Sequence, residues 1–562
     1  MDLMDIDPVT ETALFKPLGD TEFRVLLLQP APPTAPLFVN LVSTSIADPP
    51  EYDGISYVWG DSKDVRSIWC NGISVDITAS LHWALMRIRL LDRPRLVWAD
   101  ALCINQNDTQ ERSRQVTLMG YIYANTRSVF ACMGDEAQGD QHMLHIWNKM
   151  SGDVDRIERW NHLGNLMRRA WFRRAWVLQE VGLAKNPRVV YGAVEFSYRA
   201  MMALVRWVQT YARHFAASMN IGGLLIHTQW ANWIDWALNP SHQLYKLVDL
   251  LDHGALLNCR DPRDHIYAFL GHPLASRGCG GALIVPDYAK SVLQVYREAT
   301  ISLLQDAGIR ILSSVEHSKV TIHEDYPSWV IRWNTGFVLN NIYTHPNPLY
   351  RAGHTVQAGV SRIVRNRLLA RGVIFDIVDS VYIIRISEGS IHIEFAPLNG
   401  TENWSLLDLI RFLEDRTTSA YQHLRALYLA CTLACYASVD DAPSTLLSSW
   451  SSYVLWLRRN CTNEISPQAR ALYIRLVANC AGRAFIVTRN GYYGLAPHIA
   501  SPGDQCCILQ GSGVPFLLRQ MLMNESQELR LVGECLIQGV MRGEVVEMVR
   551  ANKIQEDTIS IR

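Results

Sequence analysis

Three short apolar runs in the first quarter of the chain each end in an aspartate, and this pattern limits the possible folds more than any other feature. The runs, with the residues that close them, are Ile55–Trp59 with Gly60-Asp61, Leu96–Ala99 with Asp100, and Val129–Met133 with Gly134-Asp135. Segments of helical periodicity separate them, and strands that alternate with helices indicate βαβ units and a parallel sheet. Because ligands bind beyond the carboxyl ends of such strands, the three aspartates predict a ligand crevice. Alternatively, they only cap helices or close turns, where Asp is common.

The segments between these runs carry local signals of their own. Asn71-Gly72 separates two short apolar runs, which predicts a hairpin with a type I′ turn. Asp108 and Glu111 are three residues apart, as in a capping box that opens a helix. The other expected elements are helices over 78–91 and 163–182 and a strand at 188–191.

Charge and composition narrow the classes of function. The 562 residues suffice for about two to four domains. Lys plus Arg number 53 against 54 for Asp plus Glu, so charge gives no case for a nucleic acid or an anionic membrane as partner. The acidic stretch Met1–Pro8 lacks the apolar region of a secretory signal. An apolar run at about 424–439 is too short to span a bilayer and predicts a buried helix.

The cysteines indicate a reducing compartment. The chain has 12 of them, and no two are spaced as Cys-x-x-Cys. We therefore expect free, buried thiols and a cytoplasmic protein without a membrane span.

The sequence divides into three expected parts. Residues 20–195 form an α/β domain. Residues 196–440 are mainly helical in pattern, with a β-rich stretch near 373–395. Residues 441–562 combine helices with a small β-rich unit, because glycines punctuate short apolar runs there.

Standard signatures of catalysis are missing from the chain. It has no Gly-x-x-x-x-Gly-Lys loop for nucleotide phosphates, and Gly511-Ser512-Gly513 lacks the spacing of a nucleophile elbow. His142 and His145 are three residues apart, with Cys132 nearby. Three possible ligands do not make a zinc site without a fourth, so we expect a solvated helix face and no metal.

Three segments rich in aromatic and polar residues stand out from this background. They are Tyr52–Asp61 (YDGISYVWGD), Val97–Asp108 (VWADALCINQND) and Arg174–Glu180 (RAWVLQE). In order and separation they resemble the heterokaryon-incompatibility (HET) domain of fungal proteins, with core motifs over 52–181. That family has a Ser-Tyr-x-Trp-Gly block, then Trp-x-Asp-x-x-Cys-Ile-Asn-Gln, then Arg-x-Trp-x-x-Gln-Glu. Ala99 stands where the family usually has Ile, which changes little at an apolar strand position.

The resemblance continues beyond the domain. Further family-like segments are Asp261–Gly271 (DPRDHIYAFLG), Pro286–Tyr288, Pro327–Val330 and Gly491–Leu495. Near the end, Gly533–Gly539 resembles a block that usually has an aromatic residue and a His where this chain has Leu536 and Gln538. That departure weakens any case for a C-terminal site.

The family resemblance implies programmed cell death on contact between genetically different fungal cells. HET domains are considered distant relatives of Toll/interleukin-1-receptor (TIR) domains, which implies a flavodoxin-like parallel sheet here. Some TIR domains cleave NAD with a helix glutamate near a tryptophan. In this chain Glu180 follows Trp176 by four residues, and positions i and i+4 share one face of a helix. The resemblance therefore implies NAD as a candidate substrate and a TIR-like NAD glycohydrolase as a candidate activity.

On this reading Glu180 is the catalytic residue, and a second set of residues binds the nucleotide. That set is Trp59, Gly60, Asp100, Asn105, Gln106 and Trp176. Each has an alternative: Glu180 as a structural ion pair with nearby arginines, the tryptophans as core aromatics, and Asn105 and Gln106 as turn residues before the next helix.

Taken together, the sequence predicts a cytoplasmic HET-type effector with no permanently bound cofactor. The region after residue 195 would sense a partner or restrain the effector. The alternative is a non-enzymatic module that acts through self-association or binding of a protein partner.

Overall fold

The chain divides into two compact units, Met1–Val295 and Tyr296–Arg562, and each is described by itself. The computed structural model describes residues 14–135, 164–211, 246–276, 283–334, 350–353, 361–386, 393–398, 403–415, 425–459, 464–523 and 526–562. The boundary between the units lies inside helix α14 (Val292–Ala307). This division is coarser than the three expected parts, whose boundaries stay a prediction.

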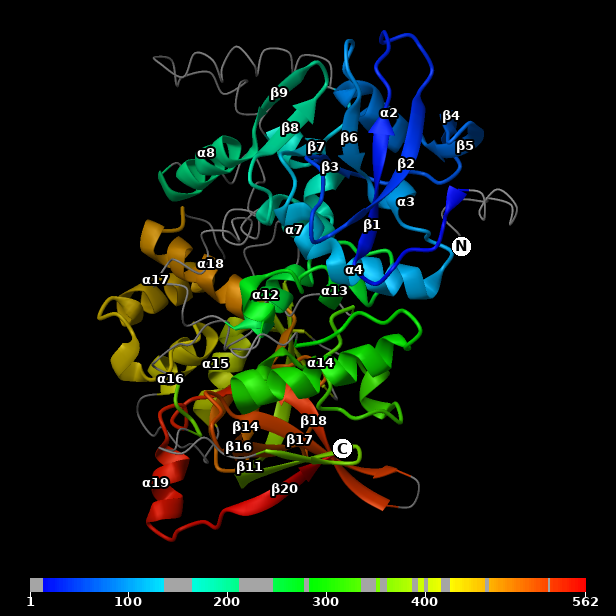
Figure 1. Ribbon diagram of the computed structural model, residues 1–562. Coiled ribbons are helices and arrows are strands. Elements are labelled where there is room, and N and C mark those ends of the chain that lie inside the picture. The colour runs from blue at the N-terminus through cyan, green and yellow to red at the C-terminus, as the bar shows by residue number, and fades with distance from the viewer. Residues whose placement is uncertain are drawn as a thin grey trace. The chain divides into compact units, whose positions relative to one another are not determined.

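The N-terminal unit is built on one nine-stranded sheet, in the order β5-β4-β2-β1-β6-β3-β7-β8-β9 (Figure 1). The strands are β1 Glu22–Leu28, β2 Phe38–Ser45, β3 Asp53–Tyr57, β4 Val65–Cys70, β5 Ile73–Thr78, β6 Arg95–Trp98, β7 Val129–Cys132, β8 Pro187–Tyr191 and β9 Val194–Ser197. Strands β6, β3, β7 and β8 are neighbours and mutually parallel, which confirms the prediction from the three apolar runs. Ranked by their place in the chain, these four strands have the order 2-1-3-4.

The sheet as a whole is mixed, so the expectation of a parallel sheet holds for part of it only. Strand β1 is antiparallel to both β2 and β6, and the pairs β4–β5 and β8–β9 are antiparallel as well. For the pairs of consecutive strands, β1–β2, β4–β5 and β8–β9, the physical reason is the short connection between them. A few residues between consecutive strands permit a hairpin, whereas a parallel pair needs a crossover of a dozen residues or more. A flavodoxin-like fold therefore stays a prediction that concerns the four parallel strands.

Local signals in the first 125 residues are largely confirmed. Asn71 and Gly72 both have positive φ, 51° and 79°, as a type I′ turn between β4 and β5 requires. Helix α2 (Ala79–Ile88) begins after Thr78, whose side chain caps it. Helix α4 (Thr109–Ala124) begins after Asp108, whose side chain accepts hydrogen bonds from the backbone N–H groups of Gln110 and Glu111. Glu111 does not complete a capping box, because its carboxylate pairs with Arg24.

The helix expected over 163–182 is interrupted. The 3₁₀ helix η1 (Ala170–Arg173) and helix α7 (Trp176–Gly182) are separated by Arg174, whose backbone is extended with φ −84° and ψ 135°. Arg174 forms an isolated parallel bridge with Asn258, and this tertiary pairing replaces continuous helix. Further helices among the described residues of this unit are α3 Asp100–Cys103, α8 Tyr198–Tyr211, α12 Leu247–Gly254, α13 Asp264–Tyr267 and η4 Pro273–Ala275.

Helices cover the sheet near its parallel strands. Helix α2 packs on β3, β4 and β5, while α7 packs on α4 and on strands β3 and β7. Strand β3 is buried along its whole length, as a central parallel strand is when helices cover both faces. The carboxyl ends of β3 and β6 are thereby fixed next to α7.

The C-terminal unit contains an eleven-stranded sheet, which is larger than the small β-rich unit expected. Its strands are β10 Arg362–Val364, β11 Arg367–Ile386, β12 Ile393–Pro397, β13 Trp404–Ser405, β14 Arg483–Thr488, β15 Tyr493–Pro497, β16 Gln505–Leu509, β17 Phe516–Met523, β18 Ser526–Glu534, β19 Leu536–Ile537 and β20 Asp557–Ile561. Strands β11, β16, β17, β18 and β20 pair in a closed ring, which makes a barrel. The long strand β11 continues beyond the ring and pairs with β12 and β14, with register shifts that let it bend.

Helices of the C-terminal unit include the expected buried one. The apolar run at 424–439 contains α16 (Arg425–Leu433), and its residues from Leu429 onward are buried. The remaining helices are η5 Gly308–Ser314, η6 Thr321–His323, α15 Leu406–Asp415, η8 Val439–Asp441, α17 Leu446–Arg458, α18 Pro467–Cys480 and α19 Glu544–Arg550. Within the described ranges, no helix has the length and apolar character needed to cross a membrane. The ten cysteines in those ranges all have free thiols.

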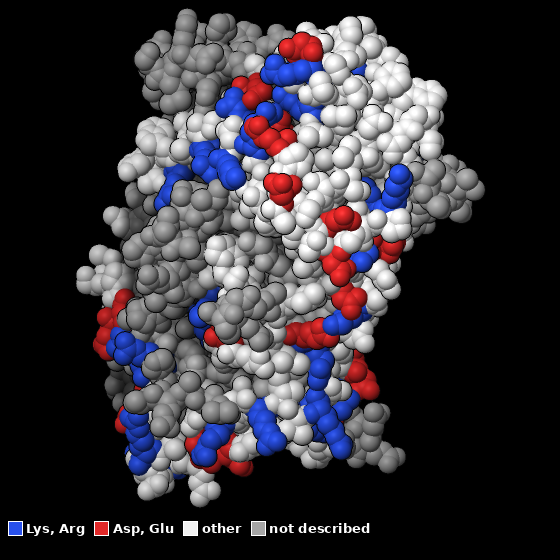
Figure 2. Space-filling model, in the orientation of Figure 1, with Lys and Arg blue, Asp and Glu red and all other residues white. Residues whose placement is uncertain are grey.

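Charged side chains on the face shown in Figure 2 are mixed in sign, with blue and red groups interspersed. This agrees with the nearly equal totals of basic and acidic residues in the sequence.

Candidate active site

The first two family segments meet where β3 and β6 end. Trp59 lies two residues beyond β3 and donates from its indole Nε1 to Oδ2 of Asp100, 2.9 Å away. Asp100 follows β6 closely and opens α3, and its Oδ1 accepts from the backbone N–H of Ala101 at 2.9 Å. Gly60, the residue after Trp59, is exposed and has a φ of +74°, a conformation that favours glycine. Two predicted site residues far apart in the sequence are therefore directly bonded.

The third segment brings a second carboxyl group to the same sheet edge. Glu180 lies on α7 and is only 2% exposed. Its Oε1 is 3.9 Å from Nη1 of Arg174. That same Nη1 donates to the backbone carbonyl of Tyr57, the last residue of β3. Glu180 is thereby tied to the carboxyl end of the central strand.

Electrostatics couple the two carboxyl groups. Burial raises the pKa of Glu180 to about 7; Arg174 and the Ser56 hydroxyl lower it, and the charge of Asp100 raises it. Burial likewise raises the pKa of Asp100, against the opposing effects of Arg174 and the Tyr57 hydroxyl. Tyr57, Asp100, Arg174 and Glu180 thus act on one another, and we refer to these four residues as the carboxylate cluster.

One oxygen of the carboxylate cluster is left open. Oε2 of Glu180 is buried and accepts no hydrogen bond from the residues that the structure describes. Buried polar atoms are normally paired, so an open acceptor in a protein interior calls for an explanation. A carboxyl group with a raised pKa and spare acceptor capacity has the properties of a functional residue. The chemistry available here is the stabilisation of positive charge or the acceptance of a hydroxyl hydrogen bond.

Asn105 and Gln106 lie just behind the carboxylate cluster, in the turn before α4. Gln106 donates from Nε2 to the backbone carbonyl of Asp100 at 3.0 Å. The backbone N–H of Asn105 donates to Oε1 of Glu111 at 2.7 Å, and its Oδ1 accepts from the N–H of Asn107 at 3.1 Å. These contacts fit the alternative in which both residues build the turn.

Trp176 has a hydrogen-bond partner outside the carboxylate cluster, although it shares α7 with Glu180. Its indole Nε1 donates to Oδ2 of Asp264, 3.1 Å away. Of the three strand-end aspartates, the other two also have separate partners. Asp61 accepts from the N–H of Lys63 at 2.9 Å, which closes a turn, and Asp135 accepts from the indole of Trp83 at 2.8 Å.

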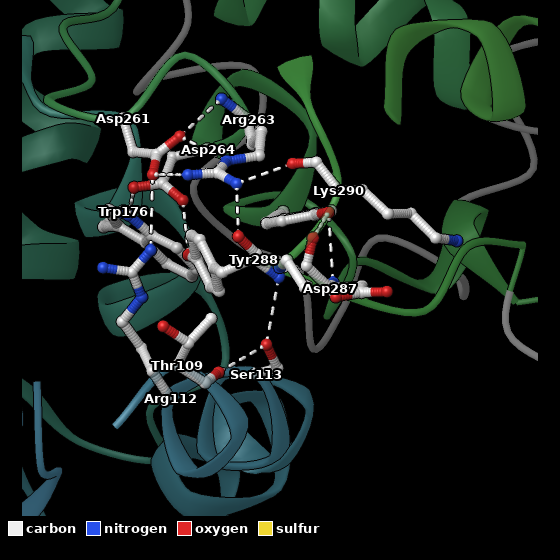
Figure 3. Close-up of polar contacts among 12 residues, drawn as sticks. Thr109, Arg112, Ser113, Trp176, Asp261, Arg263, Asp264, Asp287, Tyr288 and Lys290 are labelled. Carbon is white, nitrogen blue, oxygen red and sulfur yellow. Dashed lines mark hydrogen bonds and ion pairs between the residues drawn. The ribbon is translucent and has the colours of Figure 1, made fainter. Parts of the chain in front are cut away.

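Sequence reasoning missed a second polar group, which surrounds Asp264 (Figure 3). Tyr288 donates from its hydroxyl to Oδ1 of Asp264 at 2.6 Å, and the Arg112 guanidinium lies 3.7 Å from the centre of the Tyr288 ring. Burial raises the pKa of Asp264 to about 6, and its bonds to Tyr288 and Trp176 lower it. The available signal was the family-like segment 261–271, to which the motif alone gave no role.

The described ranges contain no group of three or more His, Cys, Asp and Glu side chains placed to hold a metal ion. His142 and His145 lie outside those ranges. Cys132 is buried at the end of β7.

Comparison with known proteins identifies the class that this fold and this site define. Residues 52–180 match the family model described as heterokaryon incompatibility protein (HET), and residues 454–555 match the Het-6 beta-barrel domain. The second match agrees with the barrel of the C-terminal unit. The chain is therefore a HET domain protein of the fungal type.

One curated relative is similar over nearly its whole length. Heterokaryon incompatibility protein 6, OR allele, of Neurospora crassa is 22% identical, and the alignment covers 94% of this chain and 95% of that protein. No solved structure matches the chain. The distant similarity to TIR domains stays a prediction.

Proposed function

We propose that this protein is a cytoplasmic cell-death effector of the heterokaryon-incompatibility type, and that its N-terminal unit cleaves NAD between nicotinamide and ribose. The observation that carries the proposal is the carboxylate cluster, in which Glu180 keeps one oxygen without a donor among the described residues. The similarity to the heterokaryon incompatibility protein of Neurospora supports the biological part of the proposal.

The place of the carboxylate cluster in the sheet supports a ligand site. With the order 2-1-3-4, the chain passes from β3 to β6 on one side and then crosses β3 to reach β7 on the other, so the direction reverses between β3 and β7. Ligands of open α/β sheets bind at such a switch point, beyond the carboxyl ends of the strands. Tyr57 is the last residue of β3, and α7, which carries Glu180, packs on β3 and β7. A flavodoxin-like, TIR-like domain is the fold that this proposal implies.

The reaction needs charge stabilisation more than proton transfer. The bond between the ribose carbon and the nicotinamide nitrogen breaks, and its electron pair stays with nicotinamide, which leaves as a neutral molecule. Positive charge develops on the ribose, and water then adds to that carbon and releases a proton, giving ADP-ribose. A fixed carboxylate in a site that excludes water stabilises such an oxocarbenium-like cation. We assign this role to Glu180 in its ionised form.

Other residues of the site receive roles that fit their contacts. Trp59 and Gly60 lie at the exposed rim and are candidates for contact with the nucleotide. Asp100 is held by Trp59 and Gln106, so we assign it to the ribose hydroxyls. Asn105 and Gln106 shape the turn that carries it. The indole nitrogen of Trp176 donates to Asp264, so we propose contact of this residue with the nucleotide only through the face of its ring.

A non-enzymatic module is the second candidate, and one observation favours it. The Glu180 side chain is only 3% exposed and lies near the Arg174 guanidinium, as in a structural ion pair. In that case the HET domain would act through self-association or binding of a protein partner. We propose such an association as the trigger of cell death for the enzyme as well.

Release of nicotinamide by the purified full chain separates these candidates. Glu180→Gln removes the charge while keeping the size of the side chain. It should lower turnover by roughly a hundred- to a thousandfold, which is what one well-placed electrostatic group contributes. Glu534→Gln is the matched control, since Glu534 forms a buried ion pair with Arg483 at 2.8 Å in the other unit. That variant should lose stability but keep its turnover per folded molecule.

Two results would contradict the proposal in different ways. If the assembled wild-type protein releases no nicotinamide, the enzymatic function is wrong and the module takes its place. If Glu180→Gln cleaves NAD as fast as wild type, the activity stands but the role of Glu180 is refuted.

A further inference from the structure

The chain returns after the HET segments to hold the stretch that carries Arg174 and Glu180. The backbone N–H of Asn258 donates to the carbonyl of Arg173 at 2.5 Å, and the N–H of Ala175 donates to the carbonyl of Asn258 at 3.2 Å. These two bonds lie on either side of Arg174, so they fix the backbone from which the guanidinium reaches the carboxylate cluster.

Helix α7 is held at two further points. Its first residue, Trp176, donates to Asp264, and one turn later Oε1 of Gln179 accepts from the backbone N–H of Gly271 at 3.1 Å. Gly271 lies so close that a Cβ atom there would be 2.8 Å from that same oxygen. Glu180 is the residue directly after Gln179. The first residue and the middle of the helix therefore contact the segment between residues 258 and 271.

That segment is itself rigidly braced (Figure 3). Tyr288 donates its hydroxyl to Asp264 and its backbone N–H to the hydroxyl of Ser113 on α4, at 2.6 and 3.0 Å. Arg263 donates to Asp261 at 2.7 Å and to the backbone carbonyls of Tyr288 and Lys290 at 2.6 and 2.7 Å. We name residues 258–271 together with Tyr288 the clamp.

Helix α7 depends on such outside support. It has seven residues and no side-chain cap at its N-terminus. A helix this short is not stable alone in water, because each new helix must first form a costly nucleus. Its position is therefore set by the groups that contact it, and the clamp supplies hydrogen bonds at Trp176 and Gln179 while the sheet supplies apolar packing.

We propose that the clamp is a positioning element of the HET effector, which holds Arg174 and Glu180 in place although it lies outside the 52–180 match. The proposal rests on the proposed function for its catalytic meaning. Its structural claim, that the clamp and Glu180 are energetically coupled, stands independently of that function. It also means that the effector does not end near residue 195.

A double-mutant cycle in the full chain tests the coupling. Trp176→Phe removes the indole N–H but keeps an aromatic ring, and it is combined with Glu180→Gln. If the clamp positions α7, the change in melting temperature of the double variant should differ from the sum of the single changes by about 2 °C or more. Trp329→Phe is the matched control, because it removes an indole bond of 3.1 Å, to the carbonyl of Asn366, in the other unit. Its effect should add to that of Glu180→Gln within about 1 °C.

A second variant keeps the test decisive where Trp176→Phe folds poorly. Gly271→Ala places a methyl group against Gln179 and acts on the middle of α7. Its coupling to Glu180→Gln should again exceed the control. If both clamp variants add to Glu180→Gln as simply as Trp329→Phe does, the clamp does not position Glu180 and the proposal is wrong.

Kinetics give a second readout where wild type cleaves NAD. Trp176→Phe should lower kcat by roughly tenfold or more and leave KM nearly unchanged, since a small misplacement of a catalytic group acts on the transition state. A variant that only lost stability would keep its kcat per folded molecule, which would count against the clamp. Absence of NAD cleavage by wild type would refute the proposed function, and the melting cycle would still decide the clamp.

Discussion

Two tryptophans of the HET segments donate to an aspartate whose two oxygens both have donors, yet the groups next to the two aspartates differ. In the clamp, both oxygens of Asp264 have a donor, Trp176 at 3.1 Å and Tyr288 at 2.6 Å. In the carboxylate cluster, Trp59 donates to Asp100 at 2.9 Å, but the nearest Arg174 nitrogen is 3.9 Å from the neighbouring Glu180. A polar group whose members satisfy one another stabilises a fold, whereas one that keeps an open acceptor can still bind something. This difference separates a supporting element from a candidate site within one unit.

The largest effect that we expect to distinguish the carboxylate cluster from the clamp is a dependence of the unfolding free energy on pH, caused by Glu180. The pKa of Glu180 is raised by burial to about 7, from an ordinary value near 4.5. The folded protein then holds a proton that the unfolded chain releases, so this stabilising contribution is complete below about pH 4.5 and is lost as pH rises to about 7. The shift corresponds to roughly 3 kcal/mol of unfolding free energy. Glu180→Gln has no such loss, so its advantage over wild type should grow between pH 5 and 8.

Denaturant titrations of both proteins at several pH values measure this difference. Asp264, whose pKa is raised to about 6, also contributes to the wild-type curve, but it contributes equally to both proteins and cancels. Parallel curves for the two proteins would show that Glu180 is ionised throughout, as in a strong structural ion pair, and would remove the contrast between the two groups.

The next largest effect concerns the clamp. There the corresponding substitution should lower the unfolding free energy instead of raising it. Asp264→Asn removes one of the two acceptors that Trp176 and Tyr288 use, and it leaves a buried donor facing another donor. We expect a loss of about 2 kcal/mol at pH 7.5, since an unsatisfied buried polar group costs about 1–3 kcal/mol. Glu180→Gln, the same chemical change in the carboxylate cluster, should cost nothing at that pH. Equal losses for the two variants, measured by urea unfolding, would mean that both groups are structural.

Much of this arrangement was predictable because it depends on short-range patterns. Each apolar run gave a parallel strand, and the carboxyl ends of neighbouring parallel strands must lie together, which brought Trp59 to Asp100. The antiparallel direction of β1 was not predictable, because a short run that is buried on both faces carries no signal of its direction.

The parts that could not be predicted depend on partners distant in the sequence. Nothing near Arg174 shows that its backbone will pair with Asn258 and so interrupt a helix. The hydrogen-bond partner of Trp176, Asp264, lies 88 residues further along the chain, and nothing near Trp176 indicates it. Helical spacing placed Trp176 and Glu180 on the same short helix, but it could not say what each side chain would meet.

The smallest expected effect concerns the indole hydrogen bond from Trp59 to Asp100. Trp59→Phe removes the donor to Asp100 and should cost about 1 kcal/mol at pH 8, as the loss of one partly buried hydrogen bond does. The bond to Trp59 lowers the pKa of Asp100 against the effect of burial, so its loss raises that pKa further. A raised folded pKa means more stability lost as pH rises, so the cost of Trp59→Phe should be smaller at low pH than at high pH. Unfolding free energies of wild type and Trp59→Phe at pH 4 and pH 8 measure this change, and the same cost at both values would show that the carboxyl of Asp100 does not respond to its indole donor.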